Sequence, residues 1–457
     1  MTGRTILTAA EMRAAEEVAI AAGTPVEALM DRAGRAAAEA IWRYIGPVPA
    51  LVLCGPGSNG GDGYVIARVL RERGVDVRVA ALGEPATEAA KWARDGWGGE
   101  VSSLAEAKPA PLLIDALFGT GLSRPLDETL AERLAALAAT ARLRVAVDLP
   151  SGAASDDGAL LSPVPDYDLT VTFQTLKSSH LLQPAARHMG KVVALDIGVD
   201  AESLLFEIAR PRILAPGPED HKYTRGYVAV AAGEMPGAAA LAATAAARSG
   251  AGYVRLLSSA ALANVPSAVV QQPESDFRPD ERLDIVVAGP GFGRSAGAGR
   301  SLDRILSWAR PMVVDADAIG LLAEPGRLER LPADSILTPH AGEFERLFGP
   351  LGTDRIAAAR AAAERSGAVV LLKGPDTIVA APDGRAAIAR PPHWLATAGT
   401  GDVLAGAVAA MYGHGFHAWN AACAAVWLHA RAAELAGPAL IADDLLPQLP
   451  RAIEDCL

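Results

Sequence analysis

Residues 50–63 read Ala-Leu-Val-Leu-Cys-Gly-Pro-Gly-Ser-Asn-Gly-Gly-Asp-Gly and join a short apolar run to a glycine-rich turn. A helical pattern follows over residues 65–70, and a second apolar run lies at 75–81. Strand, glycine-rich turn, helix and strand make a βαβ unit, which predicts a parallel sheet. The turn lies at the carboxyl end of a strand, where open parallel sheets bind ligands.

Polar residues follow the later apolar runs of the first half in the same way. Asp115, Asp148 and Ser151 each come after a short apolar run. Because the carboxyl ends of parallel strands meet at one edge of a sheet, we expect them to share a site with Asn59 and Asp62. The oxygens of Asn59, Asp115 and Ser151 suit a hard cation that helps to hold an anionic ligand. The turn lacks G-x-G-x-x-G spacing, which argues against a hydride-transfer dehydrogenase.

The second half carries its own series of strand and helix patterns. Apolar runs predict strands at 227–232, 253–257, 285–288, 312–314, 335–337 and 368–372. Residues 211–218 hold three prolines and one glycine without periodicity, which is typical of a linker. The chain is therefore predicted to be an α/β protein with two unrelated domains, at residues 1–212 and 218–457.

One stretch of the second half, Thr397-Ala-Gly-Thr-Gly-Asp-Val-Leu-Ala-Gly406, leads into an apolar helix. The free N–H groups and the dipole of a helix N-terminus suit a phosphate. A carboxylate there, Asp402, could take a proton from an attacking hydroxyl, although an Asp after a glycine-rich turn can also simply cap a helix. Gly291, His340 and Lys373 also follow apolar runs, so we expect them beside Asp402. This half is predicted to be a phosphoryl-transfer enzyme.

Composition excludes several classes of partner. Of the 457 residues, 51% are hydrophobic and 21% are charged, and the formal net charge is −11. Without a basic run, these values favour a soluble globular protein that binds neither nucleic acid nor a membrane. Three cysteines without metal-type spacing and a start without a signal-peptide core favour the cytoplasm, and no zinc site is expected. Lys177 is expected at the surface, and the chain is expected to form a homo-oligomer.

The order of these motifs resembles the bifunctional NAD(P)H-hydrate repair enzymes. In the first half the resemblance rests on Gly55–Gly63, Asp115-Ala-Leu-Phe-Gly-Thr-Gly-Leu-Ser-Arg-Pro125 and Val147-Asp-Leu-Pro-Ser-Gly152. In the second half it rests on His221-Lys-Tyr-Thr-Arg-Gly226, Ser249-Gly-Ala-Gly252, Gly289-Pro-Gly-Phe-Gly293, Asp315-Ala-Asp317, Thr338-Pro-His-Ala-Gly-Glu343, Lys373-Gly and Thr397–Gly406. Each motif alone is modest, and their joint order over both halves is specific.

The resemblance implies an NAD(P)H-hydrate epimerase of Rossmann-like fold in residues 1–212. Asp148 would contact the hydrated nicotinamide ring and assist, as acid or base, the loss and return of its C6 hydroxyl. Asn59, Asp115 and Ser151 match the family's potassium (K⁺) ligands. The residues implied to bind the hydrated dinucleotide are Ser58, Asn59, Gly60, Gly61, Asp62, Gly119, Thr120, Gly121, Leu122, Ser123, Arg124, Pro125 and Asp148.

The resemblance also implies an ADP-dependent NAD(P)H-hydrate dehydratase of ribokinase-like α/β/α fold in residues 218–457. Asp402 would deprotonate the C6 hydroxyl for attack on the terminal phosphate of ADP, giving AMP, phosphate and NAD(P)H. Mg²⁺ is implied as the counter-ion of the phosphates. The hydrate would contact Ala238, Gly291, His340 and Asp402. ADP would contact Lys373, Gly374, Pro375, Asp376, Thr377 and Gly401.

The sequence departs from the family pattern at one residue, and a second interpretation of its function is open. Family members often have asparagine where this chain has Ser58, whose hydroxyl has a shorter reach. The alternative is a small-metabolite kinase of the ribokinase type fused to a non-catalytic Rossmann-like binding module. His340 within Thr-Pro-His-Ala-Gly-Glu, and a preference for ADP over ATP, would distinguish the dehydratase from that kinase.

Overall fold

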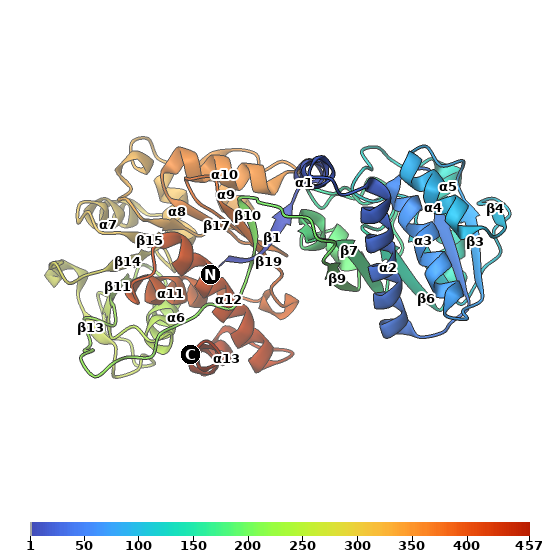
Figure 1. The fold of residues 1–457 in the computed structure, drawn as a ribbon. Coiled ribbons are helices and arrows are strands. Elements are labelled where there is room, and N and C mark those ends of the chain that lie inside the picture. Colours follow the sequence, from blue (N-terminus) through green and yellow to red (C-terminus); the bar gives the residue numbers. More distant parts are fainter. Residues whose placement is uncertain (1) are drawn as a thin grey trace. The chain divides into compact units, whose positions relative to one another are not determined.

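The computed structural model describes residues 2–457, which divide into two compact units (Figure 1). The N-terminal unit comprises residues 4–203, and the C-terminal unit comprises residues 204–457 together with the start of the chain. The division precedes the proline-rich segment 211–218. Strand β10 (Leu205–Ile208) already pairs with a strand of the C-terminal unit, and Ile213 is buried and donates its N–H to the carbonyl of Cys456. The proline-rich segment therefore lies inside the C-terminal unit.

The N-terminal unit alternates strands and helices as its sequence predicts. Its elements are α1 (Ala9–Ala21), α2 (Val26–Ile45), β2 (Ala50–Cys54), α3 (Ser58–Glu72), β3 (Val77–Ala81), α4 (Glu88–Trp97), β4 (Val101–Ser103), β5 (Leu112–Ala116), α5 (Glu128–Thr140), β6 (Leu143–Val147), β7 (Leu169–Phe173), β8 (Leu176–Lys177) and β9 (Lys191–Leu195). The first residues of strand β1 (Thr2–Leu7) are grouped with the C-terminal unit, whereas its last residues belong to the N-terminal unit and pair with β8.

Helices cover both faces of the N-terminal sheet, whose parallel strands run in the order β4-β3-β2-β5-β6-β7-β9. Along β2, Val52 and Cys54 face the core formed with α2, α3 and α4, whereas Leu51 and Leu53 face the core formed with α5. Successive side chains of a strand point to opposite faces, so a strand covered on both sides must be apolar throughout. This explains the unbroken apolar run 50–54.

The C-terminal unit contains a second series of strands and helices. Its elements are β10, β11 (Tyr227–Ala231), α6 (Pro236–Arg248), β12 (Tyr253–Leu257), β13 (Val270–Gln272), β14 (Ile285–Ala288), α7 (Ala296–Leu306), β15 (Met312–Val314), α8 (Ala316–Leu322), β16 (Ile336–Leu337), α9 (Ala341–Phe348), α10 (Arg355–Ser366), β17 (Val369–Leu372), β18 (Thr377–Ala380), β19 (Ala386–Ala389), α11 (Thr400–Gly413), α12 (Ala418–Ala436), α13 (Ala442–Leu445) and α14 (Leu449–Glu454).

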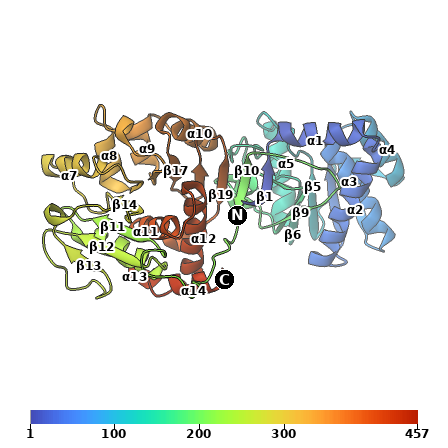
Figure 2. The same cartoon turned by 60° about the vertical axis from the view of Figure 1, so that its left-hand side comes forward.

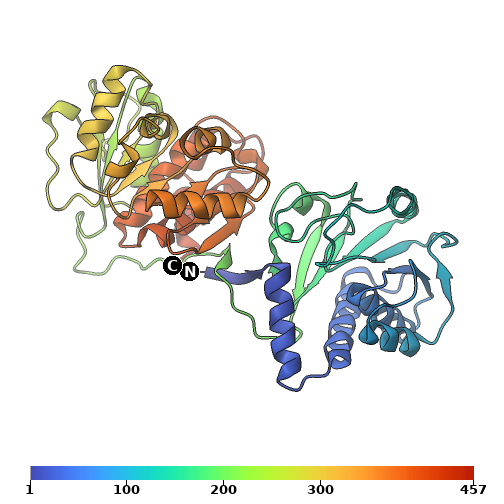
Figure 3. The same ribbon diagram turned by 90° about the horizontal axis from the view of Figure 1, so that it is seen from above.

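The C-terminal sheet is mixed and lies between two helix layers. Its strands follow the order β13-β12-β11-β14-β15-β16-β17-β18-β19-β10, and only the pairings β17–β18 and β18–β19 are antiparallel. Helices α11, α12 and α14 pack together on one face (Figure 2), and α8, α9 and α10 lie on the other, in front of the strands when seen from above (Figure 3). The predicted class is confirmed: a parallel Rossmann-like unit and a mixed α/β/α unit.

Candidate active sites

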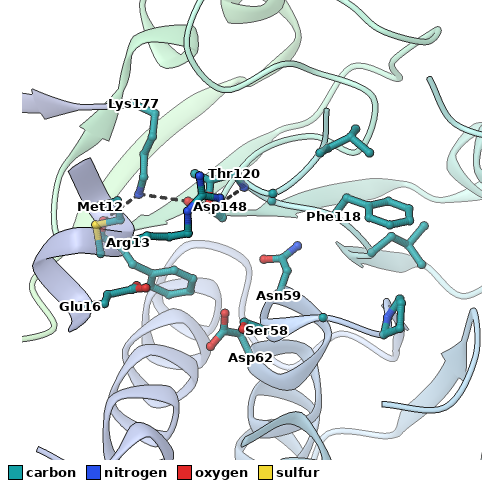
Figure 4. Close-up of a pocket in the computed structure, with 17 residues that line it drawn as sticks. Met12, Arg13, Glu16, Ser58, Asn59, Asp62, Phe118, Thr120, Asp148 and Lys177 are labelled. Carbon is teal, nitrogen blue, oxygen red and sulfur yellow. Dashed lines mark hydrogen bonds and ion pairs between the residues drawn. The ribbon is translucent and has the colours of Figure 1, made fainter. Parts of the chain in front are cut away.

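In the N-terminal unit, the carboxyl ends of β2, β5, β6 and β7 surround a pocket of about 370 Å³, here called the charged pocket (Figure 4). These four strands are neighbours in the sheet, so segments far apart in sequence meet at one edge. The predicted ligand residues that line it are Ser58, Asn59, Asp62, Gly119, Thr120, Gly121, Leu122 and Asp148.

The remaining predicted ligand residues do not line this pocket. A Cβ on Gly60 would lie 1.8 Å from the carbonyl oxygen of Gly55, and one on Gly61 would lie 2.5 Å from the sulfur of Met30. Both glycines therefore serve the close packing of α3. Ser123 lines neither this pocket nor the next one, whereas Arg124 and Pro125 line a second pocket beside it.

Asp148 has the most constrained carboxylate of the charged pocket. Its Oδ2 accepts the backbone N–H of Thr120 at 2.9 Å, and its Oδ1 accepts the hydroxyl of Thr172 at 3.0 Å. The Nζ of Lys177 lies 3.1 Å from the same Oδ1. Burial would raise the pKa of Asp148, but the ammonium of Lys177 and these donors outweigh burial and hold it below its ordinary value. Asp148 is thus an ionised carboxylate inside the protein.

The prediction that Lys177 lies at the surface is wrong, because Lys177 is 1% exposed. Strand β8 pairs with β1, with Ile6 opposite Leu176 and Leu7 opposite Lys177, so this buried lysine lies beside the N-terminal segment. Its Nζ donates to the hydroxyl of Thr172 and to the carbonyl of Phe173, both at 2.9 Å. A buried lysine needs such partners, since an isolated buried charge is costly.

His180 holds the backbone of Asp148. Its Nδ1 accepts the N–H of Lys177 at 2.8 Å, so Nε2 carries the proton and donates to the carbonyl of Asp148, also at 2.8 Å. Burial lowers the pKa of His180 to about 4, which keeps the ring neutral. Asp148 has φ of 65°, a left-handed conformation that is strained for a residue with a side chain. The bond from His180 stabilises this conformation.

Two more carboxyl groups face the charged pocket, Glu16 from α1 and Asp62 from α3 (Figure 4). The capping box formed by Thr8 and Glu11 fixes the start of α1. Burial, and then the charge of Asp148, raise the pKa values of Glu16 and Asp62. One pocket therefore combines a carboxylate whose pKa is held below its ordinary value with two carboxyl groups whose pKa values are raised, a division typical of acid–base sites.

A polar cluster lies against this pocket at the predicted cation site. Asp115 is fully buried, and its carboxylate accepts the hydroxyl of Ser151 at 2.7 Å and that of Tyr167 at 2.5 Å. Despite these donors, burial raises the pKa of Asp115. Among the residues that the structure describes, the buried side-chain nitrogen and oxygen of Asn59 have no hydrogen-bond partner. A buried amide without partners is costly, and a cation bound to its oxygen would reduce that cost.

In the C-terminal unit, the ends of β15, β16 and β17 bring together Asp315, Thr338 and Lys373. Asp315 is 1% exposed, its Oδ1 lies 2.6 Å from the Nζ of Lys373, and the hydroxyl of Thr338 donates to the same oxygen at 2.8 Å. Burial would lower the pKa of Lys373, but the charges of Asp315, Glu343 and Asp402, with the hydrogen bond to Asp315, together outweigh burial and raise it. Lys373 is therefore a fixed cation at the edge of the sheet.

Asp402 lies in the first turn of α11, close to this ion pair. The helix starts after Gly399, which has φ of 85° and supplies no side-chain cap. The N–H groups of the first turn thus stay available for an anion. A Cβ on Gly401 would lie 3.4 Å from the Nζ of Lys373, so the cation and the helix start are neighbours. Burial, and then the charge of Asp315, raise the pKa of Asp402 to about 6.

His340 caps α9 beside the same strand ends. Its Nδ1 accepts the N–H of Gly342 at 3.0 Å, and its Nε2 lies 3.3 Å from the carboxylate of Glu343. The residue forms a parallel bridge to Lys373, and its side chain is 60% exposed. His340 and Lys373 are therefore brought together as predicted, with the imidazole open to a ligand.

The other predicted residues of this half fall into two places. The carbonyl of Gly291 accepts the N–H of Met235, and a Cβ on Gly291 would lie 3.1 Å from the Cβ of Ala238. Gly291 and Ala238 therefore meet at the start of α6. Asp376 is buried, and both of its carboxylate oxygens bind the guanidinium of Arg355. Its carboxylate is therefore not directed at a nucleotide.

Three charged side chains at these candidate sites were not among the predicted site residues. Asp315 follows the apolar run 312–314, so the signal that identified Asp115 could have found it. Glu16 and Lys177 carry no such signal, since a capping box or a lysine near a strand does not show what packs against it. Within residues 2–457, no cluster of three or more His, Cys, Asp or Glu could hold a metal ion, and no helix has the length and apolarity needed to cross a membrane.

Comparison with known proteins extends these observations over nearly the whole chain. Residues 26–179 match the family described as YjeF-related protein N-terminus, and residues 228–453 match the family described as NAD(P)H-hydrate dehydratase. The bifunctional NAD(P)H-hydrate repair enzyme of Salinibacter ruber is 35% identical, over 98% of this chain and 95% of its own length. The chain belongs to the family of bifunctional NAD(P)H-hydrate repair enzymes.

A further relative and a solved structure are also similar to this chain. The Escherichia coli bifunctional NAD(P)H-hydrate repair enzyme is 33% identical over 96% of this chain and 92% of its own length. Among solved structures, the ADP/ATP-dependent NAD(P)H-hydrate dehydratase of Bacillus subtilis, co-crystallised with ATP and Mg²⁺, is 30% identical, with a TM-score of 0.49. It covers 54% of this chain and 95% of its own. The family matches and the two sequence relatives confirm the resemblance of the motifs to the bifunctional repair family.

Proposed function

We propose that the N-terminal half interconverts the R and S forms of hydrated NADH and NADPH, and that the C-terminal half dehydrates the S form with ADP. The observation that carries the first activity is the ion pair of Asp148 with Lys177 in one pocket with Glu16 and Asp62, because the pKa of Asp148 is lowered and those of the other two carboxyl groups are raised. The substrates follow from the repair family to which the chain belongs.

The epimerase chemistry needs the C6 hydroxyl to leave and to return on the other face. The ring nitrogen expels the hydroxyl as a proton reaches it, so that water and a cationic ring form. Asp62 is placed to supply that proton, and the carboxylate of Asp148 stabilises the cation. Water then adds to the opposite face and returns a proton to Asp62. No atom is gained or lost over the cycle.

Potassium fits the cluster of Asn59, Asp115 and Ser151. The orphaned amide oxygen of Asn59 and the oxygen atoms of Asp115 and Ser151 are of the kind that a hard cation prefers. When bound, the ion would supply a fixed positive charge near an anionic ligand. The protein residues themselves orient the substrate: Thr120 anchors Asp148, and the start of α3 offers free N–H groups for phosphate.

The dehydratase chemistry would rest on Asp402. Its pKa of about 6 makes it a base matched to neutral pH, able to take the proton of the C6 hydroxyl. The oxygen then attacks the terminal phosphate of ADP and releases AMP. The ring nitrogen expels phosphate from C6, and loss of a ring proton restores NAD(P)H. Lys373 and the start of α11 would bear the charge that develops on the phosphates.

The C-terminal half has candidate binding residues for two ligands, the hydrate and ADP. Ala238, Gly291, His340 and Asp402 are proposed to bind the hydrate. ADP is proposed to contact Lys373, Gly374, Pro375, Asp376, Thr377 and Gly401, with Asp376 acting through its backbone because its carboxylate binds Arg355. Mg²⁺ would arrive on the phosphates, since it commonly binds through them rather than through an all-protein cage. A cytoplasmic location and a homo-oligomeric state are also proposed.

One assay tests both activities. The full chain is incubated with a mixture of R and S hydrated NADH, ADP, Mg²⁺ and K⁺, and reduced-nicotinamide absorbance is followed. Complete recovery is expected with ADP, because epimerisation feeds the R form to the dehydratase. A phosphorylated product with ATP and no recovery of absorbance would instead support the kinase alternative. Recovery limited to the S form would refute the epimerase assignment.

A further inference from the structure

A second pocket, here called the adjoining pocket, lies beside the charged pocket. Its volume is about 550 Å³, and Phe118 and Leu122 line both pockets. Its other walls include Leu82 after β3, Leu104 after β4 and Leu130 of α5. The two pockets therefore share one wall, and a ligand of sufficient length can occupy both.

The position of the adjoining pocket matches that of a ligand site. It lies at the carboxyl ends of β3 and β4, and the charged pocket lies at those of β2, β5 and β6. In the order β4-β3-β2-β5-β6 these ends form one continuous edge of the parallel sheet. Ligands of open parallel sheets bind along this edge. The adjoining pocket thus continues the epimerase site sideways.

The charged pocket alone is small for a dinucleotide. Its 370 Å³ is near the lower end of the ~300–1,000 Å³ that drug-sized ligands occupy. A hydrated dinucleotide carries two base-bearing halves joined by a diphosphate. The half that reacts must lie against Asp148, which leaves the other half to be placed elsewhere.

The distribution of polar groups sets the direction of the ligand. Lys177, Asp148 and Glu16 lie at one side of the charged pocket, and Phe118 lies at the opposite side (Figure 4). The uncapped start of α3 at Ser58 lines the same pocket and suits a diphosphate. If the nicotinamide ring lies beside Asp148, the remainder of the ligand must extend across the charged pocket and past Phe118.

We propose that the adjoining pocket binds the adenosine half of the hydrated dinucleotide, an inference that rests on the epimerase function proposed above. Leu82, Leu104 and Leu130 offer an apolar surface for the faces of adenine. The exposed Arg124 at the same pocket offers a guanidinium that can stack on the base or neutralise phosphate charge. The adjoining pocket binds the substrate but supplies no side chain that takes part in the reaction.

The test compares two substrates that share the reacting ring. Hydrated NADH carries the adenosine half, and hydrated reduced nicotinamide mononucleotide lacks it. Epimerisation of each is followed by chromatographic separation of the R and S forms without ADP, so that the dehydratase cannot act, and the spontaneous rate is subtracted. For the unaltered protein we expect a KM at least tenfold higher for the mononucleotide.

Filling the pocket should remove this difference. Thr129→Trp places an indole in the adjoining pocket from an exposed position of α5, and Leu82→Trp does so from another wall. We expect each variant to raise the KM for hydrated NADH at least tenfold with little change in kcat, and to leave the mononucleotide unaffected. Ala135→Trp, at an exposed position of the same helix outside the pocket, is the matched control.

Three outcomes distinguish an error in the adenosine pocket from an error in the epimerase function on which it rests. An unchanged KM for hydrated NADH in both variants, or an equal loss with both substrates, would overturn the adenosine pocket while leaving the epimerase assignment intact. Failure of the unaltered protein to epimerise either substrate would overturn both.

Discussion

The Nζ of Lys177 lies 3.1 Å from the Oδ1 of Asp148, and the two side chains are 1% and 10% exposed. Inside a protein such a pair is stabilising only when further hydrogen bonds complete it, as Thr172, Phe173 and Thr120 do here. Because the ammonium keeps Asp148 ionised, the pair links the stability of the N-terminal unit to its chemistry.

Lys177→Met should impair both properties of the N-terminal unit. Removal of one partner leaves the charge of Asp148 buried and uncompensated, which costs about 3–5 kcal/mol of unfolding free energy. We expect epimerisation to fall by about 100-fold or more, since Asp148 would no longer be held ionised. Chemical denaturation and the chromatographic epimer assay measure these effects. Lys108→Met at an exposed position is the control, and an unchanged epimerase rate in Lys177→Met would contradict the role given to the pair.

Substitution of each aspartate should separate the two activities. Asp402→Asn should abolish recovery of NADH from either epimer while R and S forms still interconvert. Asp148→Asn should still permit ADP-dependent dehydration of the S form, with the R form consumed only at its spontaneous rate of epimerisation. The assays use separated R and S hydrates. Equal loss of both activities in either variant would contradict two independent sites.

The dehydratase should show an acid limb near pH 6. The pKa of Asp402 is raised to about 6 by burial and by Asp315, so the carboxylate is ionised above that pH and protonated below it. Only the ionised form accepts a proton, and kcat/KM for the S hydrate should fall about tenfold per pH unit below pH 6. Initial rates from pH 5 to 8 with separated S hydrate measure this. A rate independent of pH over that range would exclude Asp402 as the base.

The raised pKa of Asp402 favours catalysis near neutral pH but makes the folded protein less stable there. An Asp whose pKa is higher in the folded than in the unfolded protein binds its proton more tightly when folded. The contribution of Asp402 to folding therefore becomes less favourable as pH rises from about 4 to 6. Asp402→Asn should accordingly be more stable than the unaltered protein above pH 6. A thermal unfolding series at several pH values measures the difference, and a less stable variant at pH 7 would contradict this sign.

Potassium should stabilise the N-terminal unit through Asn59. An ion that binds only the folded state raises stability by mass action, and 1 kcal/mol corresponds to ~2–4 °C in melting midpoint for a domain of this size. We expect KCl, compared with choline chloride at equal ionic strength, to raise the midpoint of the unaltered protein but not that of Asn59→Ala. The variant should lose no stability in choline chloride, because the amide of Asn59 has no protein partner to lose. An equal rise in the melting midpoint of the unaltered protein and of Asn59→Ala on addition of K⁺ would refute this cation site.

Several features of this protein could be read from local sequence alone. The fold class follows from short apolar runs that end in glycine-rich or acidic residues, since strands buried on both faces must be apolar throughout. The same runs mark Asn59, Asp115, Asp148 and Lys373 as residues at the ends of strands, and the structure brings the first three to one edge of the N-terminal sheet.

Only the tertiary structure decided the charge states and the partners of these residues. Thr175 of the N-terminal unit binds the carbonyl of Thr5, 170 positions away in sequence, and the pairing of β1 with β8 buries Lys177 against Asp148. Asp376 likewise bonds to Arg355 rather than facing a ligand. A side chain's type and its neighbours in sequence determine which chemistry it can perform. Burial, and therefore pKa and hydrogen-bond partners, depends on segments that meet only when the chain has folded.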